Sequence, residues 1–451
     1  MLADGGYIKG PVNSFPLGWA SVARDIRLIK PSELSSAQYE AYLRVVSALE
    51  YNKGAGYTAV RIHGETDYAE AVGYSDARYE QGQLSLIREV NRGGIVARVN
   101  TNLRFDPESS DDKLTMDGSY LGYVFGNWGV TVDQLPMWWG PGQDQALVFS
   151  SNARPIQAIR ATRLDNAPID LPVLRNLGWW HTTAFFGNSQ ETETLGRYSI
   201  AGIRISNSLF DGFEMGLGYT GQWGGRTGRD ESSSDAFTDF LTFKSSSAVR
   251  NRFASIDFRW SPWGYGGVYG EYVLSQKGRR DTGHLIGFDF KFAGGSLSSG
   301  AMSDVFFEIS NVDVIYDDPD DPNGHTRFNR NLGGAMGQDA KGFVFGYNRY
   351  TSTGNGIEVR VRLFELGKDN EEVRTHYIEP QVGNAANHSE LEVERAMIDI
   401  TYQHPFKASL LRVGVQGWQD TLLNTMPSQR SITDINVDSG ISLHASWEWR
   451  W

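Results

Sequence analysis

The chain closes with the stretch Ile441-Ser442-Leu443-His444-Ala445-Ser446-Trp447-Glu448-Trp449-Arg450-Trp451. Apolar and aromatic residues occupy every second position, and serine, histidine, glutamate and arginine occupy the positions between them. Because successive side chains of a β-strand point to opposite faces, this stretch predicts a strand with one apolar and one polar face. Its length is close to the roughly 9–11 residues of a tilted strand that crosses a membrane.

The same two-residue period recurs along the chain from about Tyr57 onward. It is clear at 95–105, 213–223 and 357–363. Weaker versions occur at 58–63, 67–74, 81–89, 118–126, 127–134, 178–187, 196–206, 251–260, 267–275, 284–292, 303–311, 341–351, 392–402 and 408–417. Together these segments predict an all-β fold, a closed transmembrane antiparallel β-barrel of about 18 strands with a polar interior.

A pair of soluble β-sandwiches or a propeller would also alternate, but three features favour the membrane barrel. The predicted strands exceed the usual length of about 5–6 residues. Their polar face carries full charges, which a barrel lumen accepts and a soluble core does not. Tryptophans gather near strand ends, as at membrane interfaces; these are Trp128, Trp138, Trp139, Trp179, Trp180, Trp260, Trp263, Trp418, Trp447, Trp449 and Trp451.

Composition excludes several other classes of protein. The 451 residues include 51 glycines and no cysteine, which rules out disulfides, thiolate nucleophiles and cysteine-based metal sites. The net charge of −12 argues against nucleic acid as a partner. Since no run of about 18 apolar residues occurs, we expect no membrane-spanning helix.

The first 56 residues follow a different pattern. Ser35 and Gln38 have the spacing of a capping box, and apolar residues then recur at helical spacing through 36–51. We therefore expect residues 1–56 to form a small helical or irregular plug on the periplasmic side, and residues 57–451 to form the barrel. The expected location is the bacterial outer membrane, with a signal peptide already removed from the mature chain.

Connector lengths orient the barrel if both termini are periplasmic, because short and long connectors then alternate. Short connectors at 403–407, 352–354 and 261–266 alternate with long ones at 367–391, 312–340 and 224–250. The long connectors are therefore expected outside the cell. Connector 135–177 breaks the rule, since it is long but falls on the periplasmic side. We expect it to fold beneath the barrel or into its lumen.

Signals for catalysis or metal binding are poor. We find no H-E-x-x-H, no G-x-S-x-G and no phosphate-binding glycine loop. His181 and His444 fall on predicted strands, where interfacial or lumen positions explain them. The acidic loop 317–324 has the oxygen ligands that calcium requires, but its two prolines and its spacing favour a solvated loop. We expect no enzyme activity, no cofactor and no metal.

The long connector carries the most distinctive sequence. Its run Trp138-Trp139-Gly140-Pro141-Gly142, followed by Asn152, Arg154 and Pro155, resembles the capsule assembly protein Wzi family of outer-membrane proteins. The resemblance extends to the general plan of a helical N-terminal segment and then β-repeats. It implies an 18-stranded barrel with a helical plug at the periplasmic end. It also implies a surface lectin that attaches group 1-type capsular polysaccharide to the outer membrane. We expect the motif residues themselves to stabilise the fold, with Arg154 pairing a buried acid.

Two functions remain open. In the first, extracellular loops bind capsular polysaccharide through aromatic platforms and arginine forks. The expected contacts are Trp223, Arg226, Arg229, Arg279, Arg280, Arg327, Arg330 and Trp418. Alternatively, the same arginines bind the phosphates of lipopolysaccharide or are simply exposed to solvent. Outer-membrane lipid, lipopolysaccharide and other capsule export components are the further partners expected, and nucleic acid is not.

The second function is a channel, either a porin or a polysaccharide exporter. A selective anion exporter should line its lumen with one sign of charge. The predicted inner face instead mixes both signs; its charged residues include Arg98, Arg104, Arg360, Arg362, Arg412, Glu214, Glu358, Asp289 and Glu448. A mixed lumen closed by 1–56 and 135–177 favours a sealed barrel over an exporter.

Overall fold

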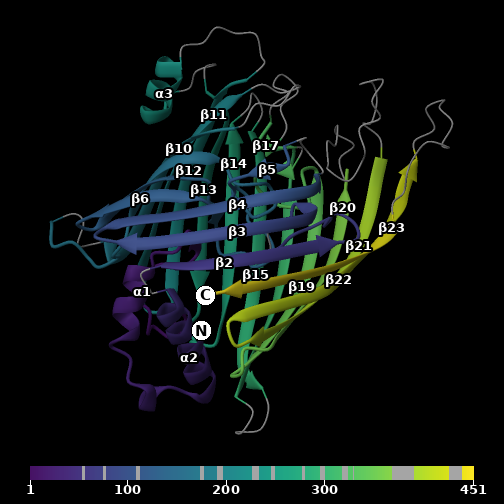
Figure 1. Ribbon diagram of the computed structural model, residues 1–451. Coiled ribbons are helices and arrows are strands. Elements are labelled where there is room, and N and C mark those ends of the chain that lie inside the picture. Colours follow the sequence, from purple (N-terminus) through teal and green to yellow (C-terminus); the bar gives the residue numbers. More distant parts are fainter. Residues whose placement is uncertain are drawn as a thin grey trace.

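The computed structural model describes residues 1–52, 56–74, 78–107, 112–172, 177–189, 197–225, 233–244, 249–276, 280–294, 300–316, 324–328, 330–367, 391–425 and 439–451. Its strands form a closed antiparallel barrel of 18 strands, as the sequence predicts (Figure 1). The last strand pairs with the first, with Arg450 opposite Ala59 and His444 opposite Glu65, so the sheet has no free edge.

The barrel strands, in chain order, are β2 (Gly56–Glu65), β3 (Glu80–Arg92), β4 (Ile95–Pro107), β6 (Tyr120–Phe125), β7 (Trp128–Asp133), β9 (Gln157–Arg163), β10 (Trp179–Asn188), β11 (Tyr198–Phe210), β12 (Phe213–Gly224), β13 (Arg250–Trp260), β14 (Gly266–Gln276), β15 (Arg280–Gly294), β16 (Ala301–Val312), β19 (Ala340–Thr351), β20 (Gly356–Leu366), β21 (Leu391–Phe406), β22 (Ser409–Thr425) and β23 (Ser439–Arg450). The short β5 (Leu114–Thr115) pairs with β4 beside β6.

The alternation in the sequence sorts side chains between the membrane and the lumen. On β23, Ile441 is 70% exposed and Leu443 is 56% exposed, whereas Ser442 between them is fully buried. An exposed row of large apolar side chains is the expected outer surface of a strand that contacts lipid. The predicted inside and outside assignment of this strand is therefore confirmed.

The barrel has two unlike ends. The turns between β11 and β12, between β13 and β14, and between β21 and β22 lie at the end where β23 finishes, which we call the terminal end. Exposed aromatic side chains gather there; they include Phe125, Trp128, Phe210, Trp260, Trp263, Tyr265, Phe406, Trp449 and Trp451. Such a band is typical of a membrane interface. The opposite end, with the longer connections, is the loop end.

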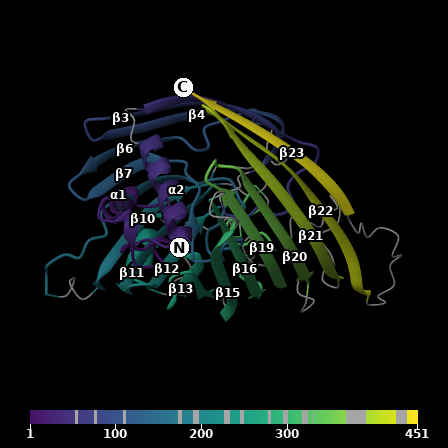
Figure 2. The same ribbon diagram turned by 90° about the horizontal axis from the view of Figure 1, so that it is seen from below.

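The N-terminal segment forms α1 (Trp19–Ile26), the 3₁₀ turn Pro31–Glu33 and α2 (Ser36–Asn52), which lie within the outline of the ring at the terminal end (Figure 2). The predicted capping box is present, since Ser35 N–H donates to Gln38 Oε1 at 3.0 Å and Gln38 N–H to Ser35 Oγ at 3.4 Å. Helix α2 packs against β15 and β16. None of the described helices is long and apolar enough to cross a membrane.

Two errors in the expected strands cancel in the strand count. Residues 67–74 are not a strand; they fold into the lumen, where Gln416 donates to the carbonyl of Ala71 at 3.0 Å. Residues 157–163, expected within a connector, form the wall strand β9 between β7 and β10. The two-residue period is weak in β9, because Ile159, which is 55% exposed, is the one large apolar residue on its outward face.

The extra strand corrects the position of the long connector. With β9 in the wall, residues 134–156 join β7 to β9 at the loop end, and only 164–178 form the connection at the terminal end. Residues 134–156, which we call the inner segment, turn into the lumen. Strand β9 thus divides the expected connector 135–177. Its first part folds into the lumen, which is one of the two expected placements, but starts from the end opposite to the expected one, because the missed β9 shifted the parity counted back from Trp451.

The main apolar core lies inside the lumen. The inner segment contributes Leu147, Phe149 and Ile156, all at most 1% exposed, and the loop between β16 and β19 contributes Ile315 and Tyr316. These side chains pack against inward-facing residues of the wall. The loop-end half of the lumen is consequently filled by protein.

Candidate functional site

Three wall glutamates hold the segments that fill the lumen by their backbones. Glu214 of β12 accepts the N–H groups of Val12 and Asn13 at 2.8 and 2.9 Å. Glu271 of β14 accepts the N–H of Leu147 at 3.0 Å, and Glu308 of β16 accepts that of Asp144 at 3.2 Å. Backbone donors buried in a lumen need such acceptors. The wall carboxylates therefore fix the positions of both the N-terminal segment and the inner segment.

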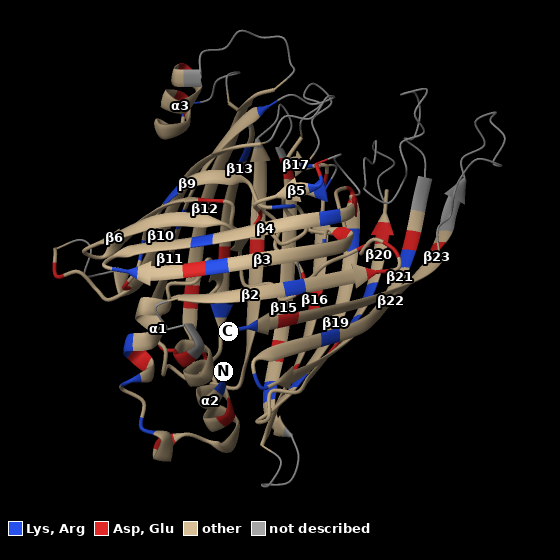
Figure 3. Ribbon diagram, in the orientation of Figure 1, with Lys and Arg blue, Asp and Glu red and all other residues tan. Residues whose placement is uncertain are grey.

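Buried ion pairs reinforce this attachment. Figure 3 shows that basic and acidic residues are both spread along the wall strands. Arg362 makes two hydrogen bonds to Asp144 of the inner segment, at 2.7 and 2.8 Å. Arg204 binds Asp257 on the wall and also donates to Ser14 Oγ at 2.7 Å. Part of the mixed lumen charge is thus neutralised in buried pairs.

The two tryptophans of the distinctive run are buried in the lumen. Strand β8 (Trp138–Trp139) pairs with β1 (Ser14–Phe15), so the run meets the N-terminal segment directly. Trp138 Nε1–H donates to the carbonyl of Gly142 at 3.1 Å. Trp139 is 1% exposed and packs edge-on against Phe149, with 4.9 Å between ring centroids. These contacts join two separate parts of the lumen filling.

The remaining residues of the run have steric or polar roles. Gly140 has φ +140°, and a Cβ there would lie 2.8 Å from Glu271 Oε2. Asn152 Nδ2 donates to the carbonyl of Asn331 at 3.0 Å. Arg154 lies 2.6 Å from Asp117 Oδ2. Pro155, which follows directly, is buried. The geometry is compatible with the predicted structural role of this run, including an acidic partner for Arg154.

A cavity of about 310 Å³ lies in the lumen beside this run. Its aromatic lining consists of Tyr74, Trp138 and Tyr350, and its charged lining of Glu358 and Arg360. Two apolar residues, two glycines and four polar residues complete the wall; these are Val12, Pro141, Gly140, Gly142, Asn13, Ser14, Gln143 and Asn348. Sites for small molecules in proteins typically measure about 300–1,000 Å³. The cavity is therefore large enough for a ligand.

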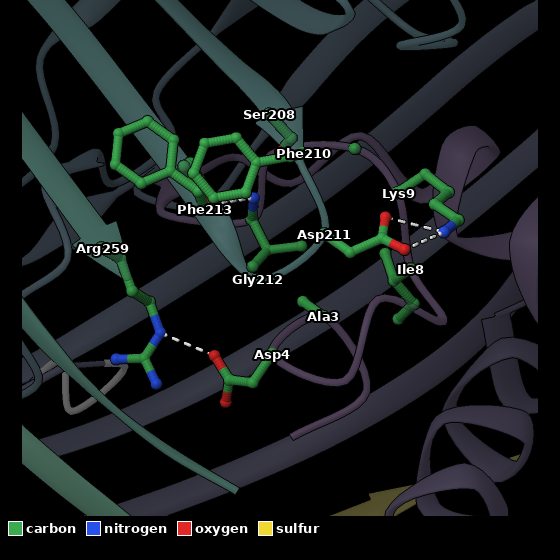
Figure 4. Close-up of a pocket in the computed structure, with 13 residues that line it drawn as sticks. Ala3, Asp4, Ile8, Lys9, Ser208, Phe210, Asp211, Gly212, Phe213 and Arg259 are labelled. Carbon is green, nitrogen blue, oxygen red and sulfur yellow. Dashed lines mark hydrogen bonds and ion pairs between the residues drawn. The ribbon is translucent and has the colours of Figure 1, made fainter. Parts of the chain in front are cut away.

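A second, much smaller cavity lies at the terminal end (Figure 4). Its volume is about 30 Å³, which is room for about two water molecules. Around it, Asp4 binds Arg259 at 2.8 Å and Lys9 binds Asp211 at 2.7 Å. Figure 4 shows these pairs joining the N-terminal segment to the wall. This crevice is the docking contact of the plug and is too small for a sugar.

Both tryptophans predicted to contact sugar are buried. Trp223, on the outer face of β12, is 3% exposed because α3 (Ser233–Leu241) covers it with Phe237 and Phe240. Trp418, on the inner face of β22, is 6% exposed within the lumen core. Neither ring is available as a platform for a sugar. The sequence showed that these rings lie near strand ends but not what covers them.

The predicted arginines divide into two groups. Arg327 of β17 (Thr326–Arg327) and Arg330 of β18 (Arg330–Asn331) are each 3% exposed, since their hairpin folds into the lumen. They donate to backbone carbonyls there, at 3.2 and 3.1 Å. Burial lowers the pKa of Arg327 to about 10, so it stays charged at neutral pH. Arg280 begins β15 at the loop end, while Arg226, Arg229 and Arg279 lie outside the described residues.

Several other expectations concern metal and proton chemistry. The acidic loop is described only at Gly324, so the calcium expectation for 317–324 falls almost wholly outside the described residues. Among the residues that the structure covers, no three His, Asp or Glu side chains form a cluster suited to a metal ion. His181 and His444 are both buried on wall strands, at 3% and 7% exposed.

A family model described as capsule assembly protein Wzi matches residues 52–431. The chain belongs to the capsule assembly protein Wzi family. A relative of this family member, an uncharacterized 55.8 kDa protein in the cps region of Klebsiella pneumoniae, is 25% identical over 284 residues. That match covers 60% of this chain, which spans only 55% of the relative.

The fold of this chain also matches that of a solved structure. That structure is of Wzi, an outer membrane protein involved in group 1 capsule assembly in Escherichia coli and a carbohydrate-binding β-barrel. The TM-score is 0.80 at 19% sequence identity, over 99% of this chain and 95% of that one. The shared architecture and the lipid-facing outer surface make this chain an outer-membrane protein.

Proposed function

We propose that this chain is a non-catalytic lectin that binds capsular polysaccharide at the cell surface and supports capsule attachment and assembly. Membership of a capsule assembly family supports the process, and the carbohydrate binding of the Escherichia coli protein supports the ligand class. In this proposal the terminal end faces the periplasm and the loop end faces the outside.

The filled lumen is the observation that carries this proposal over an exporter. The inner segment and the β16–β19 loop pack a continuous apolar core across the loop-end half of the barrel. The Arg362–Asp144 pair joins the wall to the filling, and both buried charges would lose this partner if the filling moved. Separating a buried pair is costly. A polymer could pass only after these contacts are broken.

The binding surface is then the loop end, and the remaining candidate contacts are Arg226, Arg229, Arg279 and Arg280. The guanidinium group of arginine forms bidentate hydrogen bonds with carboxylates. Uronic acids and pyruvyl groups carry such carboxylates. Because the chain has a net charge of −12, attraction to a polyanion must be local. It should weaken with salt, over a screening length of about 8 Å at physiological ionic strength. Lipopolysaccharide and other capsule export components are further partners in this proposal.

Replacement of these four arginines by alanine tests the assignment in cells. The variant should shed capsule into the medium while folded barrel stays in the outer membrane, as measured by heat-modifiable migration on gels. A matched variant carries alanine at Arg24, Arg98, Arg349 and Arg412, which lie away from the loop-end connections, and it should retain capsule. Normal capsule retention by the loop variant would contradict this reading.

A further inference from the structure

We propose that the 310 Å³ lumen cavity is a second saccharide site, open toward the terminal end and suited to one or two sugar rings. It deepens the proposed function, on which it rests, by adding a site on the opposite side of the filled lumen from the loop end. The inference comes from the lining of the cavity, its opening and its unpaired polar atoms.

Of the three lining rings, Tyr74 is the one that a sugar could pack against, since Trp138 is 3% exposed and Arg44 lies over the Tyr350 ring at 3.8 Å. Tyr74 and Trp138 meet edge-on with 5.1 Å between ring centroids, so they form one corner of the cavity. Half of the Tyr74 side chain is exposed. It also lines the cavity. Tyr74 is thus accessible to a ligand without being on an outer surface.

Polar atoms beside the cavity match the two roles of a sugar hydroxyl. Asn13 Nδ2, a donor, and Asn348 Oδ1, an acceptor, are buried and have no hydrogen-bond partner among the described residues. Both residues line the cavity. A hydroxyl group both donates and accepts, so neighbouring hydroxyls of one sugar could satisfy both atoms. Unpaired buried polar atoms are costly, and a ligand would remove that cost.

Charge in the cavity comes from one residue of each sign. Arg360 lies 3.8 Å from Asp144 and donates to the carbonyl of Val359 at 2.9 Å, which leaves further N–H groups on its guanidinium. Glu358 accepts the hydroxyl of Tyr350. An arginine and a glutamate in one cavity provide both donors and acceptors at the same small site. This combination suits a hydroxyl-rich ligand better than a purely anionic one.

The position of the lining in the strands fixes the side of entry. Asn348 and Tyr350 lie near the terminal end of β19. Glu358 and Arg360 lie near the start of β20, at the same end of the barrel. Toward the loop end, the inner segment lies in the lumen and is held to β20 by the buried pair of Arg362 with Asp144. A saccharide would therefore enter from the terminal end, which faces the periplasm in the proposed orientation.

A single cysteine tests this site directly, because the chain contains none of its own. In Tyr74→Cys, a polar maleimide should label the full-length protein in detergent. Sugars of one or two residues, prepared by acid hydrolysis of capsule from the cells that make this protein, should slow that labelling. Asp211→Cys, at an exposed turn beyond the cavity, is the matched control and should be labelled at an unchanged rate. In intact cells, an impermeant maleimide should reach Cys at position 74 only after the outer membrane is permeabilised.

A second variant measures affinity without altering Tyr74. Arg360→Ala should weaken binding of the same sugars by about tenfold, the equivalent of one lost charged hydrogen bond. Arg412→Ala, at an inward position on β22 outside the cavity lining, should leave it unchanged. If whole capsule binds but the small sugars neither protect position 74 nor bind, the lumen site is wrong and the lectin proposal stands. If capsule fails to bind as well, the proposed function fails too.

Discussion

Arg362 on wall strand β20 and Asp144 in the inner segment form a doubly hydrogen-bonded ion pair, and each side chain is only 2% exposed. The two residues are 218 positions apart in sequence. Their pairing attaches the lumen filling to the wall at a point where both charges are buried. This contact therefore holds the inner segment in its position in the lumen.

Arg362→Met should lower the free energy of unfolding by about 3–5 kcal/mol, because Asp144 loses its doubly hydrogen-bonded partner and keeps only Arg360 at 3.8 Å. Adding Asp144→Leu should recover much of that loss, since the buried carboxylate is then removed. Unfolding in denaturant, with the protein in lipid vesicles, measures both effects. Arg412→Met, at a half-buried inward position on β22, is the control. A double variant no more stable than Arg362→Met would contradict the importance of the pair.

The lipid and lumen faces of β20 make a prediction at two neighbouring positions. Val359 shares its outward face with Leu363, which is 42% exposed, whereas Arg360 lines the lumen cavity. Val359→Arg should cost about 2–4 kcal/mol, as for an arginine near the middle of the bilayer. Arg360→Val should cost less. Equal or reversed losses in a lipid unfolding assay would show that the faces are assigned the wrong way round.

Glu271 makes a prediction about conductance. Glu271→Ala leaves the buried N–H of Leu147 without its acceptor, at a cost of about 1–3 kcal/mol. The inner segment should then leave its closed position more often, and brief current steps should appear in planar bilayers. The parent protein should show no current steps. Neither should Glu394→Ala, which removes an exposed carboxylate of β21. Identical records for all three proteins would show that this glutamate does not hold the filling.

Asp4 makes the attachment of the N-terminal segment sensitive to acid. Burial by itself would raise the pKa of Asp4, but Lys291 and Arg259 hold it well below its usual range. A lowered pKa in the folded state adds stability that is present above the unfolded value of about 3.9 and lost as the pH falls below it. The thermal stability of the protein should therefore decline in acid. In Asp4→Asn this decline should be smaller, because the contribution of the Asp4 carboxylate is already absent.

Asp211→Asn is the matched control for that experiment. Asp211 pairs with Lys9 in the same crevice, but its side chain is 65% exposed. Exposed pairs contribute little, so this variant should follow the parent protein at every pH. Thermal unfolding between pH 3 and pH 7 compares the three proteins. Superimposable curves for the parent and Asp4→Asn would contradict the role assigned to Asp4.

The strand pattern and its inside and outside faces could be predicted from sequence because each strand has a period of two. The alternation of Leu443 with Ser442 is a local property that needs no knowledge of neighbouring strands. Strand β9 was not predicted from this alternation, since Ala161 on its outward face is small. The resulting parity error placed the inner segment at the wrong end, which shows how one missed strand propagates along a barrel.

The candidate site was harder to predict than the fold, because burial there depends on contacts between distant segments. Trp223 has the position of an exposed girdle residue, and only the packing of α3 shows that it is covered. Tyr74 was placed in a predicted strand, although it lies beside Trp138 in the lumen.

The most direct test of the central claim uses sealed vesicles that carry the full-length barrel and fluorescently labelled capsular polysaccharide added outside. A lectin with a filled lumen should bind the polymer to the vesicle surface, where an external quencher removes all of its fluorescence. Binding should weaken as salt is added. Fluorescence that resists the quencher, because polymer has crossed into the vesicles, or a complete lack of binding would contradict the account.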